Sequence, residues 1–284
     1  MKKILGIMLL CLLWSNPSIA VTFNEEKDKL PITPESISEW DYTCKKEDFI
    51  KYVATIEGCI ALKKLGKIDK SKKKLVIFLH GDRRDKSDYK ILEQGNFTKA
   101  IKDQKDNINF FYLARPGHKF TGRSRSVGKW KNYEVLNKKI ERVVFKKGWE
   151  MGRLISQALY RLKEYYKPDE LIVIGFSGGS INISVIVGKV PGLIDKGIMG
   201  GCDCQMQKRQ FWIGAEFIKY IPPETELILI TGKDDEYINR NTHYVREAKK
   251  QGKNVEHHIV TGEHSVKSTL LRNEGFEILK EALK

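Results

Sequence analysis

The stretch that decides the fold is Leu171–Ser180, which reads LIVIGFSGGS. Four apolar residues run directly into a turn in which a glycine stands on each side of Phe-Ser-Gly. This G-x-S-x-G pattern is typical of a sharp turn from a strand into a helix that holds the serine hydroxyl in the open. Side chains at Gly175 and Gly179 would clash with the neighbouring strand and helix, because the backbone at the serine is strained. We therefore predict a buried strand, a nucleophilic Ser177, and a helix over 181–190.

Further apolar runs on both sides of this stretch predict other buried strands. They are expected over 75–79, 107–113, 196–200, 226–231 and 255–261. Helical spacing or composition predicts helices over 133–166, 237–252 and 265–284, and a polar loop with a helix over 85–105. Strands that alternate with helices indicate an α/β fold, with a mostly parallel central sheet that is covered by helices on both faces.

Chemically useful side chains follow the carboxyl ends of the expected strands. They are His80, Arg115, Ser177, Asp235 and His264. In open α/β sheets, sites form beyond the carboxyl ends of the strands. We therefore expect these side chains to gather at one edge of the sheet.

The order of Ser177, Asp235 and His264 along the chain resembles that of the α/β-hydrolase superfamily. The resemblance covers about residues 70–284 and includes a His-Gly strand end, a Gly-x-x-Asp turn and a terminal Gly-x-His. It implies the α/β-hydrolase fold. The insert over 205–223 is only about one short helix long, so we expect a small cap or none, and a triglyceride lipase with a large lid is disfavoured.

The resemblance also implies a role for each site residue. Ser177 would attack an acyl carbon after His264 takes its proton, and Asp235 would orient the imidazole. The backbone N–H groups of Gly178 and Asp82 would bind the oxyanion.

Other acidic and histidine residues compete for these roles. Asp234 and Asp203 stay open as alternatives for the triad acid. His80 belongs to the His-Gly strand end and is expected to be structural. His257 and His258 are expected to be packing or surface residues within a strand. His243 is expected to be exposed on a helix, and His118 to be exposed in a loop.

The turn after His80-Gly81 is charged and not rich in glycine, so it departs from the HGGG-type oxyanion loop. We expect an open cleft with arginines near its mouth, which suits a polar or anionic acyl substrate, either a small molecule or derived from a polymer. Arg83, Arg115 and Phe176 are the candidate substrate-binding residues. Arg84, Arg123 and Arg125 complete the expected rim. We expect no cofactor and no metal.

The formal net charge of the 284-residue chain is +15. Such a charge favours anionic partners, but a solvated lysine-rich surface explains it equally well. A role in nucleic-acid binding would rest on charge alone, because no binding motif accompanies it. We do not expect a nucleic-acid partner.

The first 20 residues have the pattern of a signal peptide: a basic start, a short apolar run over 4–14, and small residues before Ala20. We expect cleavage near Ala20, and a periplasmic or secreted protein without a membrane span. An uncleaved anchor is the alternative. Residues 21–69 would then be a lead-in with edge elements, and residues 70–284 the catalytic domain.

Export makes disulfide bonds the expected state of the four cysteines outside the leader. Cys44–Cys59 with Cys202–Cys204 is favoured because each pair is local in sequence. A cross-link between the two pairs stays open, because a Cys-x-Cys loop is geometrically demanding. A zinc site is disfavoured by the spacings. Residues 44–64 are expected to form an edge hairpin or an N-terminal helix.

The sequence thus predicts an exported serine hydrolase that works through an acyl-enzyme, with a carboxylic ester as the favoured substrate. A serine peptidase similar to prolyl oligopeptidase is the alternative enzyme, although such peptidases usually carry a propeller or cap for which this N-terminal region is short. A non-catalytic binding protein on a hydrolase scaffold is the third possibility, and a complete triad counts against it.

Overall fold

A computed structural model describes residues 30–39, 41–81, 96–120, 124–135, 138–144, 150–205 and 214–284. The chain divides into two units, Met1–Leu30 and Pro31–Lys284. Every helix and strand of the described residues belongs to the second unit.

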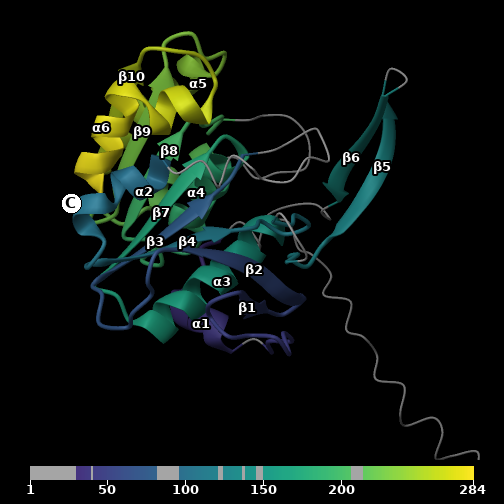
Figure 1. Ribbon diagram of the computed structural model, residues 1–284. Coiled ribbons are helices and arrows are strands. Elements are labelled where there is room, and N and C mark those ends of the chain that lie inside the picture. Colours follow the sequence, from purple (N-terminus) through teal and green to yellow (C-terminus); the bar gives the residue numbers. More distant parts are fainter. Residues whose placement is uncertain are drawn as a thin grey trace, which may run out of the picture. The chain divides into compact units, whose positions relative to one another are not determined.

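A sheet of eight strands forms the centre of this unit, in the order β1-β2-β4-β3-β7-β8-β9-β10 (Figure 1). Neighbouring strands run parallel from β4 through to β10, whereas β2 pairs antiparallel with both β1 and β4. The sheet is therefore mostly parallel, as predicted. The strands are β1 (Tyr52–Thr55), β2 (Gly58–Leu65), β3 (Lys74–Leu79), β4 (Ile108–Leu113), β7 (Glu170–Phe176), β8 (Lys196–Gly200), β9 (Glu226–Gly232) and β10 (Val255–Val260).

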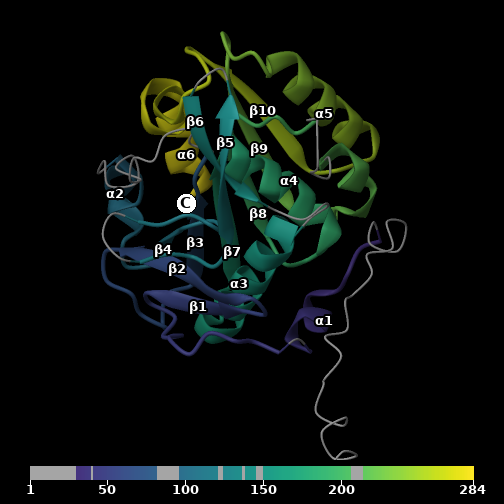
Figure 2. The ribbon, with the colours of Figure 1, turned by 90° about the vertical axis from the view of Figure 1, so that its right-hand side faces the viewer.

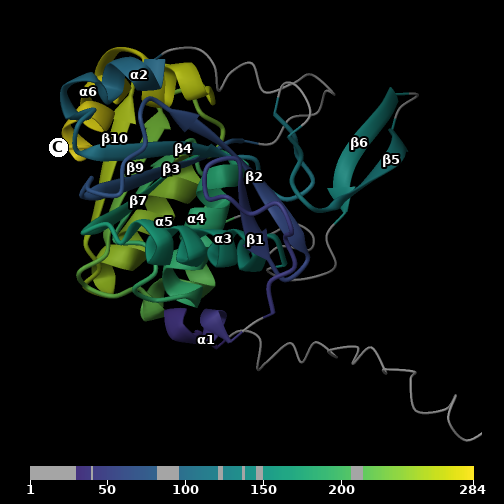
Figure 3. The same ribbon diagram turned by 60° about the horizontal axis from the view of Figure 1, so that its bottom comes forward.

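Helices cover both faces of the sheet (Figure 2, Figure 3). They are α1 (Pro34–Ser38), α2 (Asn96–Ala100), α3 (Glu150–Tyr166), α4 (Gly178–Lys189), α5 (Ile238–Lys250) and α6 (Asn273–Ala282). Further helical turns, of the 3₁₀ or π type, are η3 (Lys102–Gln104), η4 (Gly214–Tyr220) and η5 (Lys267–Leu271).

Two apolar cores follow from the alternation of side chains along the buried strands. In β3, Leu75 and Ile77 enter the core that α1, α3, α4 and α5 share with the sheet. Val76 and Phe78 point the other way, into the core beneath α2 and α6. Because both faces are covered, the central strands from β4 to β9 are apolar at nearly every position, and this is why continuous apolar runs identified them in the sequence.

The prediction of one helix over 133–166 is wrong in its first half. Residues Lys129–Val135 (β5) and Lys138–Val144 (β6) form an antiparallel hairpin, and α3 begins only at Glu150. Valine, isoleucine and tyrosine recur in this segment, and these residue types favour strands. The last helix is also interrupted: η5 ends at Leu271, Arg272 is extended, and α6 starts at Asn273.

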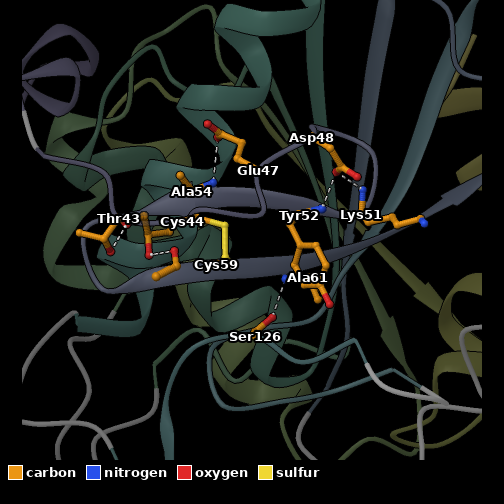
Figure 4. The surroundings of a disulfide bond; sticks show 12 residues. Thr43, Cys44, Glu47, Asp48, Lys51, Tyr52, Ala54, Cys59, Ala61 and Ser126 are labelled. Carbon is orange, nitrogen blue, oxygen red and sulfur yellow. Dashed lines mark hydrogen bonds between the residues drawn. A yellow bond between two sulfur atoms is a disulfide. The ribbon is translucent and has the colours of Figure 1, made fainter.

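Both favoured disulfides are present, Cys44–Cys59 and Cys202–Cys204. Cys59 lies in β2, and Cys44 precedes β1, so the first bond fastens the lead-in to the edge hairpin (Figure 4). Residues 44–64 thus form the hairpin and not the alternative helix. Among the described residues, we find no helix with the length and apolar character needed to span a membrane.

Candidate active site

Ser177 lies at the turn between β7 and α4, with φ of 50° and ψ of −116°. A positive φ is strained for a residue that has a Cβ atom, and such strain often marks a functional position. The surrounding structure holds the turn in place: the Ser177 N–H donates to the Gly200 carbonyl at 2.9 Å, and its own carbonyl accepts from Ile181 N–H at 3.0 Å.

The flanking glycines are required by close backbone contacts. A Cβ atom at Gly175 would lie 2.6 Å from the backbone nitrogen of Ser180. One at Gly179 would lie 2.1 Å from the carbonyl oxygen of Leu79. The steric reason given for the G-x-S-x-G pattern is therefore confirmed.

The imidazole of His264 connects the Ser177 hydroxyl to the Asp235 carboxylate. Its Nε2 lies 3.0 Å from Ser177 Oγ, and its Nδ1 lies 2.9 Å from Asp235 Oδ2. Asp235 follows β9 and His264 follows β10, so parallel strands bring residues from distant parts of the sequence to one edge of the sheet. A carboxylate only accepts hydrogen bonds, so the Nδ1 atom carries the proton and Nε2 is left to accept from the serine.

The aspartate and histidine of this arrangement differ in their exposure to solvent. The Asp235 side chain is 0% exposed and that of His264 is 25% exposed. Asp235 Oδ1 also accepts the Tyr237 N–H at 2.9 Å. Both oxygens of the buried carboxylate are thus hydrogen-bonded, which satisfies a group that is costly to bury.

Three groups fix the plane of the His264 ring. The Phe176 ring lies against it with centroids 5.1 Å apart, and the Tyr237 ring meets it edge-on at 5.0 Å. Gly201 approaches so closely that a Cβ atom there would lie 3.1 Å from His264 Cε1. Phe176, expected to bind substrate, therefore also packs on the imidazole.

The two alternative acids lie elsewhere. Asp203 Oδ2 accepts from Arg240 Nη1 at 2.8 Å, and the carboxylate raises the pKa of Arg240. Asp234 is exposed on the turn after β9. The structure thus brings Asp235 to the imidazole.

Gly178 is the first residue of α4 and is buried beside Ser177. An N–H in the first turn of a helix has no acceptor within the helix, and the helix dipole makes this end favourable for a negative charge. The expected second oxyanion donor, Asp82, lies outside the described residues, as do Arg83, Arg84 and Arg123. Gly81, directly before Asp82, is described: a Cβ atom there would lie 3.2 Å from Ser177 Cβ.

Comparisons with known proteins bear on the fold of this chain. No protein-family model and no curated protein matches the sequence. Among solved structures, the esterase Pf2001 of Pyrococcus furiosus superimposes with a TM-score of 0.60 at 17% identity, over 89% of this chain and 95% of its own.

Two further solved structures are similar. Est1E of Butyrivibrio proteoclasticus, determined with ferulic acid bound, has a TM-score of 0.53 at 13% identity, over 79% of this chain and 93% of its own. A protein of unknown function from Agrobacterium tumefaciens, suggested to be an α/β hydrolase, has a TM-score of 0.54 at 14% identity, over 81% and 91%.

The chain has the α/β-hydrolase fold. At these identities the likeness concerns the fold, so the chemistry has to be argued from the side chains of this chain.

The expectation that Arg115 lines the mouth of the cleft is wrong. Its side chain is only 1% exposed, and its Nη1 lies 3.6 Å from the sulfur of Met151. The end of β4 and the following Ala114 are buried, so Arg115, two residues after the strand, is enclosed with them. Arg125, by contrast, is exposed.

The histidines also divide into buried and exposed ones. His80 is buried, and its Nε2 accepts the Arg115 N–H at 3.1 Å, as expected of a structural residue. The prediction that His118 is exposed is wrong: it is 4% exposed, and its ring packs edge-on against that of His80 with centroids 4.7 Å apart. His243 is exposed on α5, as predicted.

Sequence reasoning missed two contributors to the site, Tyr237 and Gly201, both of which touch the His264 ring. The only signals available in the sequence were that Tyr237 comes two residues after Asp235 and that Gly201 directly follows β8. Among the described residues, no group of three or more His, Cys, Asp or Glu is arranged to hold a metal ion.

Proposed function

We propose that the protein is an exported serine hydrolase that cleaves carboxylic esters through an acyl-enzyme intermediate. The observation that carries the proposal is the continuous hydrogen-bonded line from Ser177 Oγ through His264 to Asp235, at 3.0 Å and 2.9 Å. A serine hydroxyl is a weak nucleophile until a neighbouring base accepts its proton, and this line supplies the base.

In the first half of the reaction, Ser177 Oγ attacks the ester carbonyl carbon and its proton passes to His264 Nε2. Asp235 stabilises the imidazolium that forms, without becoming protonated itself. When the tetrahedral intermediate collapses, the imidazolium returns the proton to the leaving alkoxide, and the acyl group remains on Ser177. In the second half, water attacks the acyl carbon while His264 removes its proton. The imidazolium then returns this proton to Ser177 Oγ as the acyl–oxygen bond breaks and the carboxylic acid leaves.

The oxyanion of the tetrahedral intermediate needs two hydrogen-bond donors that point at it. The N–H of Gly178 at the start of α4 is the first, and the N–H of Asp82 is proposed as the second. The contact of Gly81 with Ser177 supports this, because it brings the chain next to the nucleophile one residue before Asp82. Each such donor contributes about 3 kcal/mol to the stabilisation of the transition state.

A small or polar acyl group is the proposed substrate class. The 205–223 insert is too short for a large apolar lid, and its described part forms only η4. The esterases among the similar structures support an ester rather than a peptide bond, and the ferulic acid in Est1E illustrates a small acidic ligand in this fold. Arg83 and Phe176 are proposed to line the acyl site, and the net charge of +15 favours an anionic substrate.

Export is proposed from two features. Residues 1–20 have the sequence pattern of a leader, and two disulfides support a compartment in which cysteines are oxidised. N-terminal sequencing of the protein from the periplasm or medium should start at residue 21.

The decisive experiment compares purified wild type with Ser177→Ala on short p-nitrophenyl esters and on aminoacyl p-nitroanilides. Ser184→Ala is the matched control, because its hydroxyl bonds the Ile181 carbonyl within α4. We expect ester turnover in wild type and control, none in Ser177→Ala, and fluorophosphonate labelling only where Ser177 is present. Turnover of the anilides alone would favour the peptidase, and absence of both turnover and labelling would favour a binding protein.

A further inference from the structure

The loop that follows β8, Gly201–Cys204, carries the Cys202–Cys204 disulfide, whose two cysteines are 0% and 1% exposed. In the sheet, β8 lies between β7, which leads to Ser177, and β9, which leads to Asp235. The loop therefore begins between the strands that deliver the nucleophile and the acid.

The first end of the loop touches both the nucleophile and the base. The carbonyl of Gly200 accepts hydrogen bonds from Ser177 N–H at 2.9 Å and from Ser180 Oγ at 3.0 Å. Gly201 has φ of 53°, donates its N–H to the Ile230 carbonyl at 3.0 Å, and lies directly against the His264 ring. A shift of this backbone would move the serine turn and the imidazole together.

The loop also reaches His264 by a second route. Asp203, between the two cysteines, has a side chain 7% exposed and forms the ion pair with Arg240 of α5 at 2.8 Å. The Arg240 guanidinium lies 5.6 Å from the centre of the Tyr237 ring, and Tyr237 meets the His264 ring edge-on. Gly201 and Tyr237 thus both contact the His264 imidazole, and the positions of both depend on the loop Gly201–Cys204.

The disulfide is placed to hold this loop in one conformation. Glycine at 201 allows many backbone conformations, so the chain before Cys202 restrains the loop little. A covalent ring that closes around Asp203 restricts where its carboxylate can point. Closing a loop with a sequence separation of 2 restricts the unfolded chain less than closing one of 15, so the main effect of this bond is local.

We propose that the Cys202–Cys204 disulfide and the Asp203–Arg240 ion pair position the side chains of His264 and Ser177. The four residues that form them are thus positioning residues. The proposal rests on the proposed function, since it concerns how the same triad is aligned. The Cys44–Cys59 bond fastens the lead-in segment to β2, at the far side of the sheet from β9 and β10, and has no such role.

The first test compares two double variants, Cys202→Ser/Cys204→Ser and the matched control Cys44→Ser/Cys59→Ser. Misalignment by a fraction of an ångström affects the chemical step, so kcat for p-nitrophenyl acetate should fall about ten- to a hundredfold in the first variant. Its KM should stay within about twofold, and the control should keep kcat within about twofold of wild type. A first variant with wild-type kcat would overturn the proposal.

The second test leaves the disulfide intact, and it decides the matter if the first variant does not fold. Arg240→Gln removes the ion pair at a side chain that is 49% exposed, and Arg246→Gln on the same helix is its control. We expect a severalfold loss of kcat in Arg240→Gln, partial recovery in Arg240→Lys, and no loss in the control. Equal kcat in Arg240→Gln and Arg246→Gln would reject the route through Asp203.

An NMR measurement that needs no substrate turnover distinguishes failure of this positioning proposal from failure of the proposed function. The NMR signal of the His264 Nδ1 proton, shared with Asp235, should be sharp in wild type and broadened in the Cys202→Ser/Cys204→Ser and Arg240→Gln variants. If wild type hydrolyses no ester and takes no label, the proposed function fails while this signal still decides the positioning. An unchanged signal in both variants would overturn the positioning role alone.

Discussion

The Nε2 atom of His264 lies 3.0 Å from the Oγ atom of Ser177, although 87 residues separate them in the chain. The two side chains come from loops at the ends of β10 and β7, which are three places apart in the sheet. Such a contact is within the range for proton transfer, and it makes the pair the first target for mutation.

Asp235→Asn should lower kcat for ester hydrolysis about 10⁴-fold while the protein keeps its fold. The amide presents a donor to His264 or turns the imidazole to the wrong tautomer, so Nε2 no longer accepts the serine proton. Asp234→Asn, on the adjacent exposed residue, is the control and should keep kcat within about twofold. Steady-state kinetics on both variants decide which carboxylate acts, and the reverse pattern would assign the role to Asp234.

Gly179→Ala should destabilise the protein, because the added methyl group would lie 2.1 Å from the Leu79 carbonyl oxygen. Overpacking of this kind costs about 1–3 kcal/mol. Gly66→Asn is a suitable comparison: Gly66 has φ of 80° and no atom within 4 Å of a built Cβ, and asparagine tolerates this conformation. Thermal unfolding followed by circular dichroism should show a larger loss of Tm for Gly179→Ala than for Gly66→Asn, and equal Tm values would contradict the steric argument.

The sheet and the meeting of the site residues were predictable because they follow from simple rules. Buried strands are apolar on both faces, so β8 was predicted with the bounds that the structure has, and β4 was predicted one residue too long at its start. Parallel strands end at one edge, so the residues after β7, β9 and β10 had to converge. These two rules need no knowledge of side-chain packing.

Other features depend on packing that the sequence does not reveal. Arginine and histidine are usually exposed or only partly buried, so the burial of Arg115 and His118 went against the general tendency. The pairing of Asp203 with Arg240 joins residues that are 37 apart in the chain. The β5–β6 hairpin was mistaken for the start of α3, because apolar residues at mixed spacing fit a helix as well as a strand.

Asp48 should contribute to stability at neutral pH and lose this contribution in acid. Burial raises the pKa of its carboxyl, but the hydrogen bonds that Oδ1 accepts from the N–H groups of Ile50, Lys51 and Tyr52 outweigh this effect and lower the pKa. Figure 4 shows the bonds from Lys51 and Tyr52. A group whose pKa is lowered by folding stabilises the folded state above its unfolded pKa of about 3.9, and this stabilisation disappears as the pH falls through the folded value. Asp48→Asn should therefore be less stable than wild type at pH 7, and the difference should shrink below pH 3. Urea unfolding at the two pH values measures it, and a difference that does not depend on pH would contradict this assignment.

The two disulfides should differ in what their removal does to stability. Cys44–Cys59 joins residues 15 apart, and closing a loop of that length restricts the unfolded chain by about 3 kcal/mol. Cys202–Cys204 joins residues 2 apart, and the same relation gives about half of that. Since each kcal/mol shifts Tm by about 2–4 °C in a protein of this size, loss of the first bond should lower Tm by about 6–12 °C and loss of the second by about half as much. Calorimetry on the two double serine variants tests this order of Tm losses. For kcat we expect the reverse order, since loss of Cys202–Cys204 should lower kcat more than loss of Cys44–Cys59. A larger Tm loss from Cys202→Ser/Cys204→Ser would mean that its loop stabilises the whole fold and does not merely align His264.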